Sequence, residues 1–400
     1  MNSSLSLRTL FLQHVAQTSP FPPMLEVEKA LGVFIFDTQG KRYIDFISGI
    51  SVSNVGHCNP HVVKAIQKQS ERFMHVMVYG EFVQSPQVKL AQAIVSVLPE
   101  KLNSVYFVNS GSEATEGALK LAKRLTGRTE LISFKNAYHG SSHGALSVMG
   151  SEVYKQAYRP LLPDVRSLEY NDFNSLDFIT SKTATVIVEP IQGEAGAFVP
   201  DKTWLIALRN KCTETGTILI FDEIQTGFGR TGAFFAFEHS GVVPDILLMA
   251  KGMGGGLPIG AFVASREHMQ ALTNQPILGH ITTFGGNAVC CAASLAVFEL
   301  LSDRELIKKV SSKEAIIRNR MVHPHIKAIH GKGLLLALDL GSNEIALPVM
   351  NRCMELGLIT DWFLFADHCL RIAPPLTITE EEINQACDIF LQAIRDVCES

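Results

Sequence analysis

The chain has 400 residues, of which 46% are hydrophobic and 18% are charged, and its formal net charge is -4. This composition is typical of a globular protein and excludes a disordered one, and the length allows two domains or one large α/β domain with an appendage. No Lys/Arg-rich run is present and the apolar runs are strand-sized, so we expect neither a nucleic-acid partner nor a membrane partner.

The N-terminal segment carries one Arg and no acid in residues 1–23. A transit peptide is a weak alternative here. The preferred interpretation is a helix that ends at Pro20, Pro22 and Pro23. The following stretch, "GVFIFDTQGKRYIDF", predicts a hairpin with its turn at Gln39 and Gly40.

The eight cysteines form no Cys-x-x-Cys pair, which favours buried thiols in a reducing compartment, so we expect a cytoplasmic protein. In "GHCNPH", the residues His57, Cys58 and His61 are close in sequence. Zinc is an alternative interpretation, but no second ligand pair with the usual spacing follows. A turn that leads into a helix starting near His61 is preferred, and no metal is expected.

Short apolar runs alternate with helical patterns through the middle of the chain. The runs are nearly apolar throughout, which is typical of parallel strands covered on both faces. The strands are expected at 104–108, 130–134, 184–189, 218–222, 245–250 and 260–264. The sequence therefore predicts an α/β fold with a mostly parallel sheet flanked by helices.

The pattern changes near residue 295, where longer amphipathic helices begin. We expect a large domain at 55–295 and a smaller α+β domain built from both chain ends, 1–54 and 296–400, because chain termini often lie close together.

The stretch "ILIFDEIQTGFGRTG" delivers Asp222 at the end of an apolar strand, with Gln225 three residues on. A charge at such a place must be paired or must serve a ligand. The same stretch contains G-x-G-x-x-G at 227–232, the pattern of a dinucleotide site. That site needs a strand joined directly to a helix, which is not evident here, so a nicotinamide enzyme is a distant alternative.

Two other strand ends carry candidate cofactor residues. In "NSGSEATEGALK", backbone N–H groups at a helix start and the hydroxyls of Ser110 and Ser112 would form a phosphate cup. Taken alone, this stretch is better explained as an ordinary helix cap, with Ser112 followed by acids. In "NAYHG", Tyr138 could stack on a ring, although most such tyrosines only pack.

Lys251 ends another apolar run, in "MAKGMGGGLPIGA". Desolvation at a strand end lowers the pKa of a lysine, and a neutral amine is what a Schiff base requires. The alternative is a surface lysine in a loop. Together, a phosphate cup, a stacking ring, an acid and a desolvated lysine are what pyridoxal phosphate requires. Asp222 would keep the pyridine nitrogen protonated, Gln225 would bind the ring hydroxyl, and Ile224 would pack beneath the ring.

With these motifs, the sequence resembles the class III aminotransferases, the fold type I pyridoxal-phosphate family of acetylornithine, ornithine and 4-aminobutyrate aminotransferases. The resemblance extends from "DTQGKRYIDFISGISVSNVGHCNP" to "RIAPPLTIT". It implies a seven-stranded sheet, Lys251 as the Schiff-base lysine, and a homodimer with shared active sites. The other cofactor contacts that it implies are Asp222, Gln225, Gly111, Ser112, Tyr138 and, reaching the phosphate of the neighbouring subunit, Thr283.

The resemblance also implies substrate contacts. Arg371 resembles the arginine that binds the carboxylate of glutamate and 2-oxoglutarate, and Glu194 resembles the gate that pairs with it. Two positions depart from the family. Ser141 stands where an arginine usually grips the donor's distal carboxylate, and Ile50 stands where ornithine enzymes carry a tyrosine.

We therefore expect transfer of an amino group from an ω-amino donor, such as acetylornithine or ornithine, to 2-oxoglutarate. The alternatives are a 4-aminobutyrate or diamine aminotransferase, an aminomutase or a decarboxylase of the same family.

Overall fold

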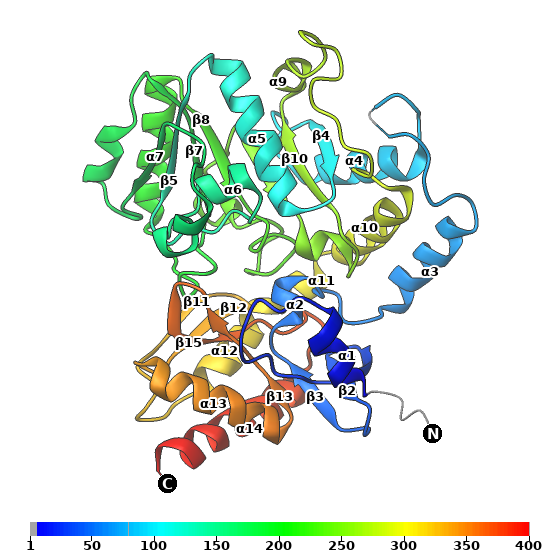
Figure 1. Cartoon of the computed structure of the whole chain (residues 1–400), viewed down its shortest axis with the longest axis vertical. Helices are drawn as coiled ribbons and strands as arrows, with labels where there is room; N and C mark the ends of the chain where they lie inside the picture. The colour runs from blue at the N-terminus through cyan, green and yellow to red at the C-terminus, as the bar shows by residue number, and fades with distance from the viewer. Residues whose placement is uncertain (1–5, 79, 400) are drawn as a thin grey trace.

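The computed structural model describes residues 6–78 and 80–399. In Figure 1, a seven-stranded sheet and its helices form the upper body, and the first and last helices, α1 (Leu7–His14) and α14 (Glu380–Cys398), lie in the lower body. In the described residues, no helix has the length and apolar character needed to cross a bilayer.

The central sheet has the strand order β4-β10-β9-β8-β7-β5-β6. Only β10 runs antiparallel to its neighbours, so the expected mostly parallel, seven-stranded sheet is confirmed. The strands are β4 (Ser104–Val108), β5 (Glu130–Phe134), β6 (Val165–Leu168), β7 (Thr183–Val188), β8 (Ile218–Asp222), β9 (Ile246–Met249) and β10 (Gly260–Ala264).

Helices cover both faces of this sheet, which explains why its strands are apolar throughout. On β8, Ile220 packs in the cluster that contains the buried face of α5 (Gly111–Thr126), while Leu219 and Phe221 pack in the cluster that contains α7 (Lys202–Thr215) and α10 (Ala288–Leu301). Helix α5 approaches β10 closely because Gly117 has no side chain. A Cβ there would lie 2.3 Å from the ring of Phe262.

The remaining helices of this body are short or peripheral. Helices α3 and α4 pack against α10, which crosses the boundary expected at residue 295. The domain limits themselves stay a prediction. The helices are α3 (Pro60–Ser70), α4 (Ser85–Ser96), α6 (His143–Ser147), α8 (Phe237–Ser240) and α9 (Arg266–Gln270).

Two smaller sheets build the lower body. One joins the two ends of the chain, because β13 pairs in parallel with β3. Its strands, in sheet order, are β1 (Val27–Leu31), β2 (Phe34–Asp37), β3 (Arg42–Asp45) and β13 (Leu358–Ile359). The other has the order β11 (Ala328–Lys332), β12 (Leu335–Asp339), β15 (Ala366–Ile372) and β14 (Trp362–Phe363). The helices of the lower body that follow α10 are α11 (Glu305–Lys308), α12 (Val310–Arg320), α13 (Asn343–Leu356) and α14 (Glu380–Cys398).

The N-terminal region confirms the hairpin and corrects the helix. Strands β2 and β3 pair, and the Asp37 carboxylate accepts hydrogen bonds from the N–H groups of Gln39 and Lys41 in the turn. Helix α1 (Leu7–His14) ends at His14, well before Pro20, so the prediction that prolines end it is wrong. Val15 already has an extended backbone. Helix α1 buries none of its residues, so no packing against the rest of the protein extends it towards the prolines.

The two histidines of "GHCNPH" form hydrogen bonds with different carboxylates. His57 Nε2 lies 2.7 Å from Asp45, and His61 Nε2 lies 2.6 Å from Glu299. Helix α3 begins at Pro60, where the side chain of Asn59 accepts a hydrogen bond from the His61 N–H, as the preferred interpretation required.

Candidate active site

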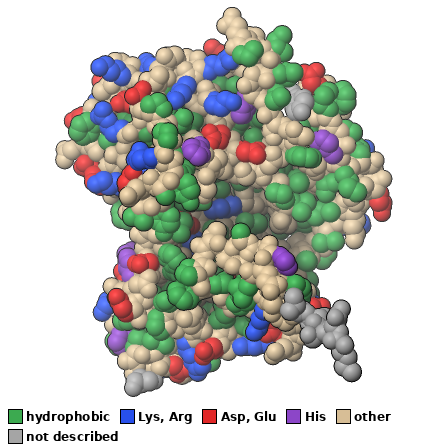
Figure 2. Space-filling model, in the orientation of Figure 1, with side chains coloured by type: hydrophobic (Ala, Val, Ile, Leu, Met, Phe, Trp, Pro, Cys, Tyr) green, Lys and Arg blue, Asp and Glu red, His purple; other side chains and the backbone are tan. Residues whose placement is uncertain are grey.

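A cavity of about 750 Å³ lies at the ends of the central strands, and Figure 2 shows the molecule hollowed between its two bodies. The segments that follow β4, β5, β8 and β9 line it. Such ends of an open α/β sheet are where ligands bind. The residues expected from the sequence that line this cavity are Gly111, Ser112, Tyr138, Ser141, Asp222, Ile224, Gln225 and Lys251.

Lys251 follows β9 at the edge of the cavity, in the 3-10 turn η4 (Lys251–Gly254). Its φ is +46°, in the left-handed region that a side chain rarely adopts, and such strain is concentrated at functional sites. Burial lowers the pKa of its ammonium, while the carboxylates of Glu194 and Asp222 act in the opposite direction. Burial is the largest of these effects, so the pKa of Lys251 lies below that of an ordinary lysine.

Two glycines beside Lys251 stand where a side chain would clash with the protein itself. A Cβ at Gly252 would lie 2.5 Å from Asn54, and a Cβ at Gly255 would lie 2.8 Å from Val297. They therefore let the turn pack against the protein itself. Gly256, in contrast, lines the cavity.

Asp222 and His139 form a buried pair at the floor of the cavity. His139 Nδ1 lies 2.7 Å from Asp222 Oδ2, and the other carboxylate oxygen accepts a hydrogen bond from the Ile224 N–H. Sequence reasoning quoted "NAYHG" but did not single out His139. No local pattern in the sequence marks His139 as the partner of Asp222.

Glu189 was also missed by sequence reasoning. Its place in the sequence was the available signal, because Glu189 ends the apolar run 184–189 as Asp222 ends the next strand. Its carboxylate accepts hydrogen bonds from the N–H groups of Tyr138 and Gly193. Burial, together with the charge of Asp222, raises the pKa of Glu189 to about 7, although His139 opposes this.

The start of α5 provides a cup of small residues beside Lys251. Ser110 caps the helix by accepting a hydrogen bond from the Glu113 N–H, so the cap is Ser110 and not Ser112 as expected. Ser112 Oγ instead lies 2.7 Å from Ser142 Oγ across the cup. A Cβ at Gly111 would lie 2.7 Å from Ile224 Cδ1, so a larger residue here would displace the Ile224 side chain.

Gln225 offers the cavity a free hydrogen-bond donor. Its Nε2 is buried with no hydrogen-bond partner among the described residues, and the residue lines the cavity. A buried amide N–H without a partner is costly unless a ligand accepts from it. Together with the Ile224 side chain and the helix start, these groups fit a planar, phosphorylated pyridine.

Arg371 and Glu194 form an ion pair next to the cavity rather than on its wall. Arg371 Nη2 lies 3.1 Å from Glu194 Oε2, and the arginine is 1% exposed. The expected pair is thus in contact, and both residues act electrostatically on Lys251. Asp361, which sequence reasoning missed, lies 2.7 Å from Arg371 Nε.

Three further residues singled out in the sequence, Ser141, Thr283 and Ile50, have the following surroundings. Ser141 Oγ lies 3.1 Å from the Tyr138 hydroxyl. Thr283 is exposed and outside the cavity, although its neighbour Thr282 accepts a hydrogen bond from Asn109 beside the cup. Ile50 has a φ of +63° in the left-handed turn α2 (Ser48–Ser51), and Val52 lines the cavity nearby.

The G-x-G-x-x-G pattern at 227–232 has a structural explanation. The segment after β8 forms turns, and the helix that follows, α8, has only four residues. A Cβ at Gly229 would lie 2.8 Å from Leu376 and 3.0 Å from Ile307, both in the C-terminal part of the chain. These glycines therefore serve close packing, and the strand-to-helix junction of a dinucleotide site is not formed.

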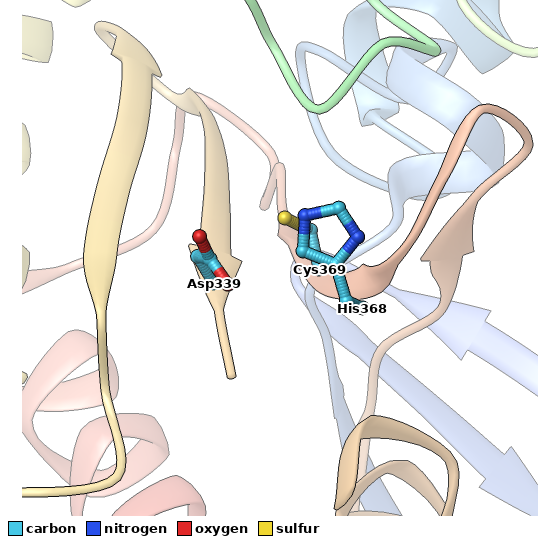
Figure 3. Close-up of side chains that lie close together, drawn as sticks. All are labelled: Asp339, His368 and Cys369. Atoms are coloured by element: carbon cyan, nitrogen blue, oxygen red, sulfur yellow. The ribbon is translucent and has the colours of Figure 1, made fainter. Parts of the chain in front are cut away.

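One group of potential metal ligands lies away from the cavity, on β12 and β15. Figure 3 shows Asp339, His368 and Cys369, whose ligand atoms lie within 4.8 Å of one another. Burial raises the pKa of the Cys369 thiol to about 12, and Asp339 adds to this. The thiol is therefore protonated at neutral pH. The sulfur packs beneath the loop that carries Glu194, since a Cβ at Gly196 would lie 3.7 Å from it.

A sheet with a lysine, an aspartate and a small-residue cup at its strand ends is the arrangement of a pyridoxal-phosphate enzyme. A model of the family described as "Aminotransferase class-III" matches residues 15–394, and the chain belongs to this family. The resemblance seen in the sequence is confirmed. The chain is accordingly a transaminase whose cofactor is pyridoxal phosphate.

Individual proteins that are similar to this chain are also named as aminotransferases. The chain is 37% identical over 387 residues to the acetylornithine aminotransferase of Methanopyrus kandleri, covering 96% of this chain and 97% of the relative. It is 39% identical over 390 residues to that of Methanocaldococcus jannaschii, covering 94% and 93%. A solved ornithine aminotransferase from Toxoplasma gondii, whose structure contains pyridoxal phosphate at partial occupancy, is 30% identical with a TM-score of 0.91, covering 98% and 94%.

Proposed function

We propose that the protein transfers an amino group from an ω-amino donor of the acetylornithine or ornithine type to 2-oxoglutarate, which yields glutamate. The observation that carries this proposal is the Arg371–Glu194 pair beside Lys251. Enzymes similar to this chain are named acetylornithine aminotransferases, which supports the same donor class.

Bound pyridoxal phosphate supplies an electron sink for the negative charge that develops on the reacting carbon of the substrate. Lys251 would hold the cofactor covalently and then carry the proton to and from that carbon. Asp222 would keep the pyridine nitrogen protonated, with His139 holding its carboxylate in place. Gln225 would donate its free N–H to the ring hydroxyl. Three other residues would hold the cofactor, namely Gly111 and Ser112 at its phosphate and Tyr138 against its ring.

The two substrates would use the arginine differently. A donor whose reacting carbon bears no carboxylate leaves Arg371 nothing to bind, and Glu194 then neutralises it. When 2-oxoglutarate or glutamate enters, Glu194 would move away and the guanidinium would bind the carboxylate through two parallel hydrogen bonds. In either state, the buried Nη2 of the arginine would thus keep a carboxylate partner, and leaving it without one would be costly.

The donor's other end would lie near Ser141. Because serine has no charge, this side of the cavity does not provide the cation that a distal carboxylate prefers. The same observation favours a second candidate, a diamine aminotransferase.

We also propose an assembly and a compartment. Thr283 would reach the phosphate bound by a neighbouring subunit, so the protein would be a homodimer with shared active sites. Its exposed position outside the cavity of its own chain is consistent with this role. All eight cysteines are free thiols, which supports the cytoplasm.

A screen of amine donors with 2-oxoglutarate as acceptor tests the proposal, with glutamate formation as the readout and Lys251→Ala as the inactive control. Ornithine, N-acetylornithine and terminal diamines would be compared with 4-aminobutyrate. Product formed without any oxo-acid acceptor would instead identify an aminomutase or a decarboxylase. No glutamate from any of these donors would refute the proposal.

A further inference from the structure

The segment 360–365, between β13 and β15, holds Arg371 from several sides. The Thr360 hydroxyl donates to the carbonyl of Arg371 at 2.7 Å, and the N–H of Arg371 donates to the carbonyl of Asp361 at 2.7 Å. The ring of Phe363 lies under the guanidinium, 4.1 Å from its central carbon. The position of the arginine is therefore coupled to the backbone of this segment.

Two carboxylates contact the guanidinium, and they differ in how they are attached. Asp361 belongs to segment 360–365 and is fixed to the Arg371 backbone by the hydrogen bond described above. Glu194 comes from the loop that follows β7, in the other body of the molecule. Its carboxylate also accepts a hydrogen bond from the Leu364 N–H at 3.3 Å. The Glu194 carbonyl also accepts a hydrogen bond from the Phe365 N–H at 3.0 Å, so only the side chain of Glu194 would turn away from the arginine, while Asp361 stays with it.

The contacts of the two carboxylates leave one edge of the guanidinium available. Asp361 occupies Nε at 2.7 Å, and Glu194 occupies Nη2. Nη1 is buried and has no hydrogen-bond partner among the described residues. A carboxylate can bind an arginine side-on, through Nε and Nη2, or end-on, through Nη1 and Nη2. With Asp361 on Nε, the departure of Glu194 frees only the end-on edge.

We propose that Asp361 is a positioning residue that directs the substrate carboxylate to the Nη1–Nη2 edge of Arg371. The proposal rests on the proposed function, because it takes Arg371 to bind that carboxylate. Without Asp361, the guanidinium could rotate and offer its side-on edge, or follow Glu194 when the pair opens. The substrate would then bind in orientations that do not place its reacting carbon at Lys251.

The test uses the cofactor-loaded enzyme and three variants. Asp361→Ala removes the hydrogen bond, and Asp361→Asn keeps an acceptor oxygen for Nε. Asp367→Ala, an exposed acid on β15, is the matched control for loss of one charge. Stopped-flow absorbance would follow the glutamate and donor half-reactions separately. Binding of glutarate, a dicarboxylate that cannot react, would be measured from the cofactor spectrum.

We expect Asp361→Ala to weaken glutarate binding and the glutamate half-reaction roughly ten- to a hundredfold, as misplacement of a bidentate contact does. The donor half-reaction should change by no more than about twofold, because the rotated arginine touches no donor carboxylate. Asp361→Asn should recover most of the loss, and Asp367→Ala should behave like the unmodified enzyme.

Three outcomes would overturn the positioning role. These are an unchanged glutamate half-reaction in Asp361→Ala, equal losses in both half-reactions, and an Asp361→Asn variant as impaired as Asp361→Ala. Thermal unfolding of each variant separates these results from misfolding. If the unmodified enzyme bound glutarate but did not react with glutamate, the proposed function would fail, while glutarate binding would still test Asp361.

Discussion

His139 Nδ1 lies 2.7 Å from Asp222 Oδ2, and both side chains are buried. The pair therefore fixes the orientation of Asp222 at the floor of the cavity. A carboxylate held in this way would contact a bound pyridine nitrogen without reorganisation at the moment of reaction.

The first prediction concerns this pair. Asp222→Ala should raise the barrier by several kcal/mol, because without this carboxylate the pyridine nitrogen would lose its proton and the ring would accept negative charge from the substrate poorly. His139→Asn should give a smaller loss, since Asp222 keeps its bond to the Ile224 N–H. Steady-state kcat values at saturating pyridoxal phosphate measure both. Near-normal turnover in Asp222→Ala would show that this acid has another role.

The second prediction concerns attachment of the cofactor. Borohydride reduction of the yellow holoenzyme, followed by peptide mapping, should place the cofactor on Lys251. Lys313 is a useful internal control, because it is also buried but donates to the carbonyl of Leu376 far from the cavity. A label on Lys313, or on any other lysine, would contradict the assignment.

The cofactor side of the site could be predicted from the sequence for a physical reason. Lys251, Asp222 and Tyr138 each follow an apolar run, and the carboxyl ends of parallel strands meet at one edge of a sheet. Strand β6 was missed because its central residues, Arg166 and Ser167, are exposed at the sheet edge and polar.

The partners of these residues could not be predicted in the same way. Asp361 contacts Arg371 through a strand pairing of the lower body, and His139, after β5, contacts Asp222 at the end of β8, two strands away in the central sheet. No local pattern marks either residue, because each depends on which strands become neighbours. The N-terminal cap of α5 could not be predicted for a similar reason. Ser110 and Ser112 are both acceptable caps by type, and only the backbone conformation selects Ser110.

The third prediction concerns the pH dependence of stability. Glu223 is fully buried, and burial raises its pKa from 4.5 to about 7, although the N–H groups of Ala236 and Phe237 oppose this. The folded protein then keeps a proton that the unfolded chain releases between those pH values. The free energy of unfolding should therefore fall as pH rises through this window, by up to about 3 kcal/mol from this group.

Glu223→Gln should flatten that dependence, because the amide does not titrate. Chemical denaturation at several pH values would measure it, with the exposed Glu71 changed to Gln as the control. A slope identical to that of the unmodified protein would show that Glu223 titrates normally and that its hydrogen bonds outweigh its burial.

The fourth prediction concerns assembly. If Thr283 reaches the phosphate in a neighbouring subunit, sedimentation at micromolar concentration should show a dimer or a multiple of it. Thr283→Ala should weaken binding of pyridoxal phosphate while leaving the sedimentation pattern unchanged, because it removes one hydroxyl and little surface. An active monomer would contradict shared active sites.

The fifth prediction concerns Arg371 and Glu194. Arg371→Ala should damage the glutamate half-reaction far more than the donor half-reaction, because only glutamate places a carboxylate there. Loss of a buried, bidentate charged contact is worth roughly 2–5 kcal/mol. Stopped-flow measurement of the two half-reactions provides the comparison. Equal losses in both would refute the gate.

The donor's distal end, away from Arg371, would lie near Ser141. We expect weak activity on 4-aminobutyrate, and better activity on a terminal diamine or an amine with an uncharged tail, neither of which carries a distal carboxylate. Ser141→Arg should raise activity on 4-aminobutyrate, because it supplies the missing cation beside Tyr138. Ser141→Gln is the control for added bulk without charge. High 4-aminobutyrate activity in the unmodified enzyme, or equal effects of the two variants, would show that Ser141 does not select the donor.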